Sequence, residues 1–172
     1  NIKGDGYLAG RTAWDRAVSH TMNPDAEYHI LNETLRRVFY EKRWQRETCM
    51  PHRIFFSQGN YPLKGLHYLL WAMPDILKKY PDTEIYVAGD NVTRYASVKE
   101  KLKIGSYGKY LRDEIVKYGL EEKVHFLGRL QAEDMCDAYL KSELFVSASA
   151  LENSPNSVGE AMLLGMPVVS SA

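Results

Sequence analysis

Short apolar segments alternate with helical patterns from Pro51 onwards, and this alternation is the strongest constraint on the fold. The expected strands are RIFFSQ, EIYVAG, VHFLG, LFVSAS and PVVSS, at residues 53–58, 84–89, 124–128, 144–149 and 167–171. Segments of helical periodicity lie between them, at residues 64–79, 108–118, 131–141 and 157–164. Strands joined through helices form right-handed crossovers. The sequence therefore predicts an α/β fold with a doubly wound parallel sheet.

The first 50 residues do not follow this alternation. Residues 25–46 have apolar positions at helical spacing, which predicts one amphipathic helix; these positions are Ile30, Leu31, Leu35, Val38 and Phe39. Residues 1–24 show no sustained period, so the pattern alone assigns them no element. The composition changes near Thr48 to Pro51, and we place a domain boundary there, between residues 1–50 and 51–172.

The overall charge is balanced, with 22 basic and 22 acidic residues in a chain of 172. No net field attracts nucleic acid or an anionic membrane, so any anion recognition has to be local. The apolar stretches are far shorter than a bilayer-spanning helix requires, and residues 1–20 show no signal-peptide pattern. We therefore expect a cytoplasmic protein.

Cysteine and histidine give no sign of a metal site. Cys49 and Cys136 are far apart in the sequence, and the histidines have no cysteine or carboxylate partner at ligand spacing. We expect no metal and no cofactor in this domain. The chain opens on Asn1 and stops directly after an expected strand, which suggests a piece of a longer protein.

Two basic segments each have two interpretations. A solvated helix face explains the first better than a helix lying on an anionic membrane, because acids interrupt it; its cations are Arg36, Arg37, Lys42, Arg43 and Arg46. Peripheral association with the inner face of the membrane stays the alternative. A solvated insertion explains the second better than nucleic-acid binding, since no nucleic-acid motif accompanies it; it contains Lys101, Lys103, Tyr107, Lys109 and Tyr110.

The segment ENSPNSVGE, residues 152–160, is the strongest candidate for a functional site. Its SPNS run favours the start of a helix, whose free backbone N–H groups attract an anion. Glu152 precedes that helix, and Glu160 lies about one turn inside it, within reach of ligand hydroxyls. Singly, the two acids would pass for a solvated loop residue and a helix-dipole acid. Together, at the carboxyl edge of a parallel sheet, they favour a ligand site.

This segment resembles the E-x7-E signature of the retaining glycosyltransferases of the group 1 family. SQGNYPLKGLHYLL is similar to the family's first strand and its loop ending in Lys-Gly, and EIYVAGD and VHFLGRL are similar to its second and third strands. The motifs occur in the family's order across residues 51–172, while GRTAWDRA, at residues 10–17, is a weaker match. The resemblance implies the two-domain GT-B architecture. Residues 1–50 would end the amino-terminal domain and form the interdomain segment, and residues 51–172 would form an incomplete, Rossmann-like nucleotide-sugar-binding domain.

The resemblance also implies roles for individual residues. Glu152 would contact the sugar of the donor, and Glu160 its ribose hydroxyls. Lys64 would neutralise the donor's diphosphate, a role that also suits an ammonium group at the carboxyl edge of the first strand. The loop and helix start would add further donor contacts, from Asn153, Ser154, Pro155, Asn156 and Ser157.

Arg129 and Leu130 follow the third expected strand, where family members contact the nucleobase. Arg129 is equally well explained as a surface arginine. The chain departs from the family at Gly59, because many members have an arginine there, five residues before the lysine, which shares the diphosphate. Either Gln58 and Asn60 with backbone amides of this loop replace that arginine, or another cation enters the site.

The hypothesised reaction transfers a sugar from a nucleoside diphosphate sugar to an acceptor hydroxyl, with retention of the anomeric configuration. Glu152 and Lys64 would carry the catalysis. The acceptor, whether a glycan, a lipid or a small molecule, would bind a domain absent from this chain, so the piece alone is expected to bind nucleotide weakly and to transfer little. Two alternatives stay open: a sugar-nucleotide epimerase of GT-B fold, and a non-enzymatic α/β binding module.

Overall fold

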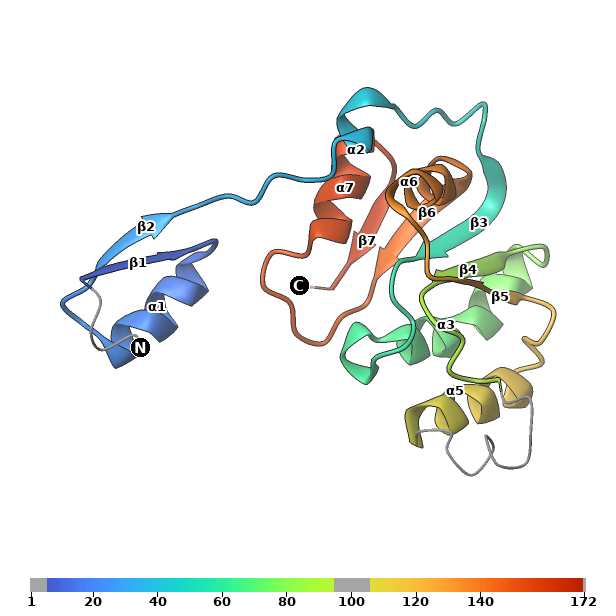
Figure 1. The fold of residues 1–172 in the computed structure, drawn as a ribbon. Helices are drawn as coiled ribbons and strands as arrows, with labels where there is room; N and C mark the ends of the chain where they lie inside the picture. The colour runs from blue at the N-terminus through green and yellow to red at the C-terminus, as the bar shows by residue number, and fades with distance from the viewer. Residues whose placement is uncertain (1–5, 95–105, 172) are drawn as a thin grey trace.

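The computed structural model of the protein describes residues 6–94 and 106–171. Its larger part is a five-stranded parallel sheet with strand order β5-β4-β3-β6-β7 (Figure 1). The strands are β3 (Met50–Phe56), β4 (Glu84–Ala88), β5 (Val124–Gly128), β6 (Ser142–Ser147) and β7 (Val168–Ser170). This arrangement confirms the predicted doubly wound α/β fold.

Helices cover both faces of the sheet. On one face, α3 (Leu66–Lys79) and α5 (Ser106–Lys117) pack over β3, β4 and β5, around a cluster that contains Leu70, Ile85 and Leu111. On the other face lie α6 (Ala132–Leu140), α7 (Asn156–Leu164) and the short α2 (Val38–Glu41). Each predicted helix after Pro51 is therefore present, with ends that differ from the expected ones by no more than two residues.

The second cluster is built around aromatic side chains. The rings of Phe55 on β3, Tyr139 on α6 and Phe145 on β6 lie with centroids 4.7 Å (Phe55–Tyr139) and 5.0 Å (Tyr139–Phe145) apart. Phe39 on α2 closes the cluster with its ring 5.6 Å from that of Tyr139, and all four side chains are fully buried. This face of the sheet thus fixes α6 and α2 against the central strands.

The order of the strands reverses at the centre of the sheet. From β3 the chain proceeds outward to β4 and β5, and it then returns through α6 to β6, on the other side of β3. The loops that follow β3 and β6 consequently lie side by side, and the backbone N–H of Ala150 donates to Leu63 O at 2.8 Å. In open parallel sheets, ligands bind at the carboxyl end of such a reversal.

A small separate unit precedes the sheet. It consists of β1 (Tyr7–Gly10), α1 (Ala13–Met22) and β2 (Glu27–Ile30), with β1 and β2 paired in parallel. The helix begins with a capping box, in which Thr12 and Asp15 exchange hydrogen bonds. Figure 1 shows this unit to one side of the sheet, joined to α2 by an extended segment.

The expected helix over residues 25–46 is wrong. Residues 27–30 form β2, residues 31–36 are extended, and helix occurs only at α2. Ile30 and Leu31, two of the apolar positions that suggested the helix, are 63% and 62% exposed, whereas Phe39 is fully buried. In β2, backbone hydrogen bonds to β1 take the place of helical hydrogen bonds. Apolar residues at helical spacing stabilise a helix only when they pack against another surface.

By packing, α2 belongs with the sheet, although it precedes the predicted boundary at Pro51. Trp44 donates its backbone N–H to Leu164 O at 2.9 Å and its indole N–H to Ser142 O at 2.8 Å. The predicted division into residues 1–50 and 51–172 stays a prediction. In the second basic segment, Lys101 and Lys103 lie outside the described residues, and Tyr107 and Tyr110 stand on α5.

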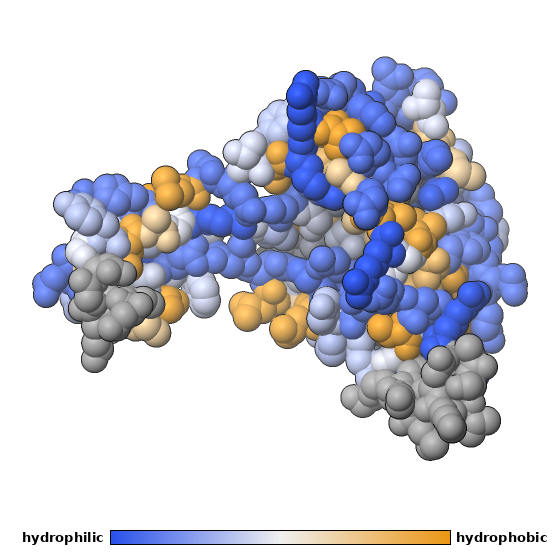
Figure 2. All heavy atoms as spheres, in the orientation of Figure 1, coloured by the Kyte–Doolittle hydropathy of each residue, from blue (hydrophilic) through white to orange (hydrophobic). Residues whose placement is uncertain are grey.

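Hydrophilic side chains cover most of the face seen in Figure 2, and hydrophobic ones appear in small groups. In the part of the chain that the structure describes, no helix is both long enough and apolar enough to cross a membrane.

Replacing Phe55 tests the aromatic cluster. Phe55→Ala removes a fully buried ring at the centre of the sheet, and we expect it to lower the free energy of unfolding by about 3–5 kcal/mol. Urea denaturation followed by circular dichroism measures the change. Val116→Ala, at a 56% exposed position on α5, is the control and should change stability by less than about 0.5 kcal/mol. Equal losses in the two variants would contradict the assignment of the core.

Candidate functional site

A cavity of about 570 Å³ opens at the carboxyl edge of the sheet, beside the reversal of strand order. It is lined by the loops after β3 and β6, by α6 and the start of α7, and by Arg11, Glu33, Thr34 and Arg36 of the preceding segment. Eight of the predicted site residues lie on its wall: Lys64, Glu152, Asn153, Ser154, Pro155, Asn156, Ser157 and Glu160. The fold thus brings Lys64 beside residues that follow it by 88 to 96 positions in the sequence.

The first turn of α7 forms one wall of this cavity. The helix starts at Asn156, one residue earlier than predicted, after Pro155 in extended conformation, and it ends at Leu164, followed by the C-cap Gly165 with a φ of 80°. Pro155 O accepts hydrogen bonds from the N–H groups of Val158 and Gly159, at 3.1 and 3.3 Å. The N–H groups that precede them in the first turn have no intrahelical partner and carry the positive end of the helix dipole.

Glu152 and Lys64 meet across the cavity. Lys64 is the last residue of the 3₁₀ turn η2 (Pro62–Lys64), and its ammonium forms an ion pair with Glu152 Oε1. The hydroxyl of Ser149 donates to the same oxygen at 2.8 Å. Both charged side chains are less than one-third exposed, at 29% for Lys64 and 23% for Glu152. The lysine and the first acid of the motif therefore face one ligand-sized space.

Glu160 is buried and paired with an arginine that the sequence did not identify as part of the site. Its side chain is 5% exposed, and its two carboxylate oxygens accept hydrogen bonds from Arg36 Nε and Nη2, each at 2.7 Å. These hydrogen bonds raise the pKa of the Arg36 guanidinium. The guanidinium also lies over the ring of Phe39, 4.9 Å from its centroid. The structure thus places Arg36 in the cavity and not on the solvated helix face that the sequence favours.

The small amino-terminal unit holds the loop before α7. Arg11 Nη2 donates to Ser154 O at 2.7 Å and to Asn156 Oδ1 at 2.6 Å, and Arg11 Nη1 pairs with Glu33 at 2.6 Å. Asn153 accepts from the hydroxyl of Thr12 at 2.7 Å, and it donates to Asp15. The backbone N–H of Arg11 is the main cause of a lowered Asp15 pKa. The segment GRTAWDRA, the weaker match to the family, thus contacts the segment ENSPNSVGE, which carries the stronger match.

Four predicted site residues lie outside the wall of this cavity. Arg129 is 82% exposed and forms a bidentate ion pair with Asp90, with its shortest contact at 2.7 Å. Leu130 packs against the second core cluster. Asn60 has its side chain beside Gly89. Gly59 is buried below the loop, and its N–H donates to Ala88 O at 3.3 Å. Their predicted contacts with a donor stay predictions.

The structure explains why position 59 has no side chain. A Cβ at Gly59 would lie 2.4 Å from Val87 Cγ1 and 2.8 Å from Leu66 Cδ2, both in the first core cluster. These distances are well below van der Waals contact. The packing of β4 and α3 therefore excludes an arginine at this position, unless the core around it moves.

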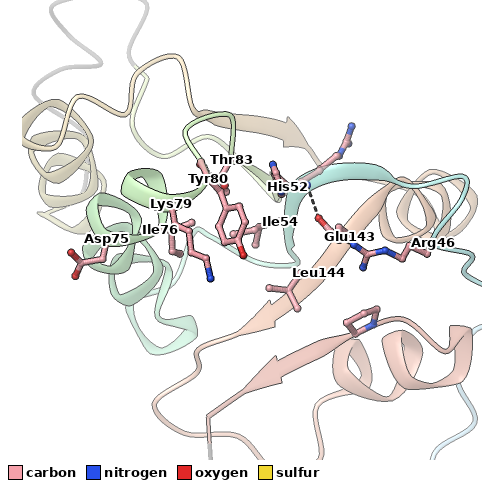
Figure 3. Close-up of a pocket in the computed structure, with 12 residues that line it drawn as sticks. Arg46, His52, Ile54, Asp75, Ile76, Lys79, Tyr80, Thr83, Glu143 and Leu144 are labelled. Carbon is pink, nitrogen blue, oxygen red and sulfur yellow. Dashed lines mark hydrogen bonds and ion pairs between the residues drawn. The ribbon is translucent and has the colours of Figure 1, made fainter.

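A second cavity, of about 690 Å³, lies at the opposite, amino edge of the sheet (Figure 3). Ile54, Ile76, Leu144 and Pro167 form its apolar floor. The backbone N–H of His52 donates to Glu143 at 2.6 Å on the rim. None of the predicted site residues lines this cavity, which lies away from the edge where parallel sheets bind ligands.

Within residues 6–94 and 106–171, no group of three or more histidine, cysteine, aspartate or glutamate side chains is placed to hold a metal ion. Cys49 and Cys136 are free thiols. The expectation that the domain works without a metal stays a prediction.

The fold and the cavity define a class: an α/β protein with a Rossmann-like parallel sheet and a polar, charged cavity where its strand order reverses. Comparison with known sequences then assigns the family. Residues 40–172 match the family of glycosyl transferases group 1, and the chain belongs to it.

Curated relatives share part of the chain. An uncharacterized glycosyltransferase of Methanocaldococcus jannaschii is 30% identical over 109 residues, and a phosphatidylinositol N-acetylglucosaminyltransferase subunit of Homo sapiens is 25% identical over 108 residues. Each match covers 63% of this chain but only 24% and 19% of the two relatives, respectively. The chain therefore spans about a quarter or less of the length of the curated relatives it matches.

Solved structures share the fold over almost the whole chain. The pneumococcal O-GlcNAc transferase GtfA, in complex with UDP and GlcNAc, has a TM-score of 0.72 at 14% identity, covering 96% of this chain and 30% of that one. Sucrose-phosphate synthase from Thermosynechococcus elongatus has a TM-score of 0.74 at 18% identity, covering 99% of this chain and 42% of that one. The sheet is that of the carboxyl-terminal, Rossmann-like domain of GT-B glycosyltransferases.

The packing around Gly59 leads to a prediction. We expect Gly59→Arg, which introduces the arginine common in the family, to lower the free energy of unfolding by about 1–3 kcal/mol, because the core has no room for it. Thermal denaturation measures the loss. Gly6→Ala is the control, since a Cβ at Gly6 meets nothing within 4 Å. A Gly59→Arg variant as stable as the wild type would show that the core yields at this position.

Proposed function

We propose that the protein transfers a sugar from a nucleoside diphosphate sugar to an acceptor hydroxyl, with retention of the anomeric configuration. One observation carries the proposal: Glu152 and Glu160 stand on either side of the first turn of α7, in one cavity that also contains Lys64. A sugar, a diphosphate and a ribose require hydroxyl acceptors at two ends and an anion site between them.

Each group of the cavity would then have a distinct task. The Glu160 carboxylate accepts hydrogen bonds from the ribose diol, and Glu152 holds the hydroxyls of the sugar. Lys64 and the N–H groups at the start of α7 stabilise the negative charge that develops on the leaving diphosphate, as preorganised donors do in water-poor sites. No covalent intermediate with a protein side chain is part of this proposal.

Family membership supports the transfer of a glycosyl group in general. The donor class agrees with the UDP and GlcNAc named for the pneumococcal transferase. Retention rests on the resemblance of residues 152–160 to the E-x7-E signature. The acceptor would bind other parts of a longer protein, because the relatives extend well beyond the part that this chain matches.

Replacing Glu160 tests the ribose contact. We expect Glu160→Gln to weaken binding of UDP, GDP or ADP, whichever the wild-type chain binds, by about 10-fold or more, since hydrogen bonds to a charged group contribute about 1.5–3 kcal/mol. Isothermal titration calorimetry measures the affinity, and Glu122→Gln at an exposed position is the control. Unchanged affinity in the Glu160 variant would refute the ribose assignment.

Replacing Glu152 tests the sugar contact in the full-length enzyme. We expect Glu152→Gln to lower kcat for transfer by about 100-fold or more and to leave nucleotide affinity within about threefold, because the residue acts on the sugar and not on the nucleotide. Product analysis separates the transferase from an epimerase, which would release nucleotide without an acceptor. Transfer at the wild-type rate would rule out this role for Glu152.

A further inference from the structure

The cavity at the carboxyl edge contains equal numbers of positive and negative side chains. The charged residues on its wall are three cations, Arg11, Arg36 and Lys64, and three acids, Glu33, Glu152 and Glu160. Each cation is paired with one of these acids. The charged side chains of the cavity wall therefore balance, and each cation has an acidic partner. A diphosphate, which brings negative charge on both of its phosphates, requires that some of these pairs open.

The proposed function decides which pairs open. Hydroxyl groups of the ligand would take Glu160 and Glu152, so the partners of these two acids, Arg36 and Lys64, would lose their present contacts. Glu33 has no ligand role, and Arg11 also holds Ser154 and Asn156, so Arg11 keeps its partners. Arg36 and Lys64 are consequently the cations that ligand binding releases.

Of these two ion pairs, the one between Arg36 and Glu160 blocks its acid more completely than the one between Lys64 and Glu152. The guanidinium of Arg36 donates to both carboxylate oxygens of Glu160, whose side chain is only 5% exposed. Each oxygen can accept a second hydrogen bond, but so little of this side chain is open that a ribose diol reaching both oxygens would have to take the place of the guanidinium. Arg36 itself is 40% exposed on the cavity side, so it has space to move. A released guanidinium is well suited to a phosphate, because its planar array of donors matches phosphate oxygens in pairs.

Position 59 cannot supply this second cation. Gly59 has no side chain, and one added there would displace Val87 and Leu66 in the core. With Lys64 alone, a diphosphate would have one lysine for two charged groups. Arg36 lines the same cavity and reaches it from another segment of the chain.

We propose that Arg36 is the second diphosphate-binding cation of this protein. In the free protein it is held on Glu160, and it transfers to the diphosphate when the ribose takes that carboxylate. The inference rests on the proposed function and adds to it a binding residue from the segment before α2.

Titration of Arg36 variants tests the inference. Wild type, Arg36→Gln, Arg36→Lys and the control Arg37→Ala are titrated with a nucleoside diphosphate and with the matching nucleoside; Arg37 is 92% exposed on the neighbouring position. We expect Arg36→Gln to weaken diphosphate binding about 10-fold or more and to leave nucleoside affinity equal or tighter. Arg36→Lys should recover part of the loss, because it restores the charge without the fork.

Four outcomes would overturn the inference. Tighter binding of both ligands by Arg36→Gln would mean that Arg36 only blocks Glu160. An equal loss of affinity for the nucleoside and the nucleoside diphosphate, together with a lower Tm, would mean that Arg36 has a structural role. Glutamine keeps N–H donors for Glu160, which limits such a loss of stability. If the wild type binds no nucleoside diphosphate, the proposed function fails together with the inference, whereas normal wild-type binding with unchanged Arg36→Gln binding removes the inference alone.

Discussion

The parallel pairing of β3 with β6 is the constraint on which the rest of the site depends. These two strands are neighbours in the sheet although α3, β4, α5, β5 and α6 separate them in the chain. Their loops leave the same edge side by side, so Lys64 and Glu152 meet across a separation of 88 positions. The register between Phe55 and Phe145 sets the height of both loops, and the aromatic cluster below them holds that register. The aromatic cluster thus packs against β3 and β6, and the site lies at the carboxyl ends of these same two strands.

Charge compensation governs the cavity above this edge. A carboxylate as buried as Glu160 is costly to keep ionised without a partner, and a bidentate guanidinium is the partner that satisfies both of its oxygens. The proposed function requires acids for hydroxyls and cations for phosphates at close range, and in this structure these groups neutralise one another. The paired state is therefore the expected resting state of such a site.

Periodicity predicted the sheet well because each strand and helix is short, apolar on the buried side and bounded by turn residues. The predicted strand at 124–128 coincides with β5, and the start of α7 was displaced by one residue only. The same reasoning failed at residues 25–46, where the apolar spacing was helical but only Phe39 is fully buried. A local sequence pattern does not show what a segment pairs with in the fold, and here β2 pairs with β1. The residues of the cavity wall were likewise predictable only where they stand in recognisable motifs, as Lys64, Glu152 and Glu160 do. Arg36 acquires its role from a partner 124 positions away, and the neighbours that exclude a side chain at Gly59 meet it only after folding.

The contacts between the β1–α1–β2 unit and the loop before α7 have a mechanical consequence. They are made by polar groups at least partly open to solvent, among them Arg11, Thr12 and Asp15, and the covalent connection to α2 is an extended strand of chain. Polar contacts of this kind contribute far less to stability than a packed apolar interface of similar extent. Neither core cluster of the described residues includes one from this unit, so its place beside the mouth of the cavity depends on these polar contacts and on the single connection to α2.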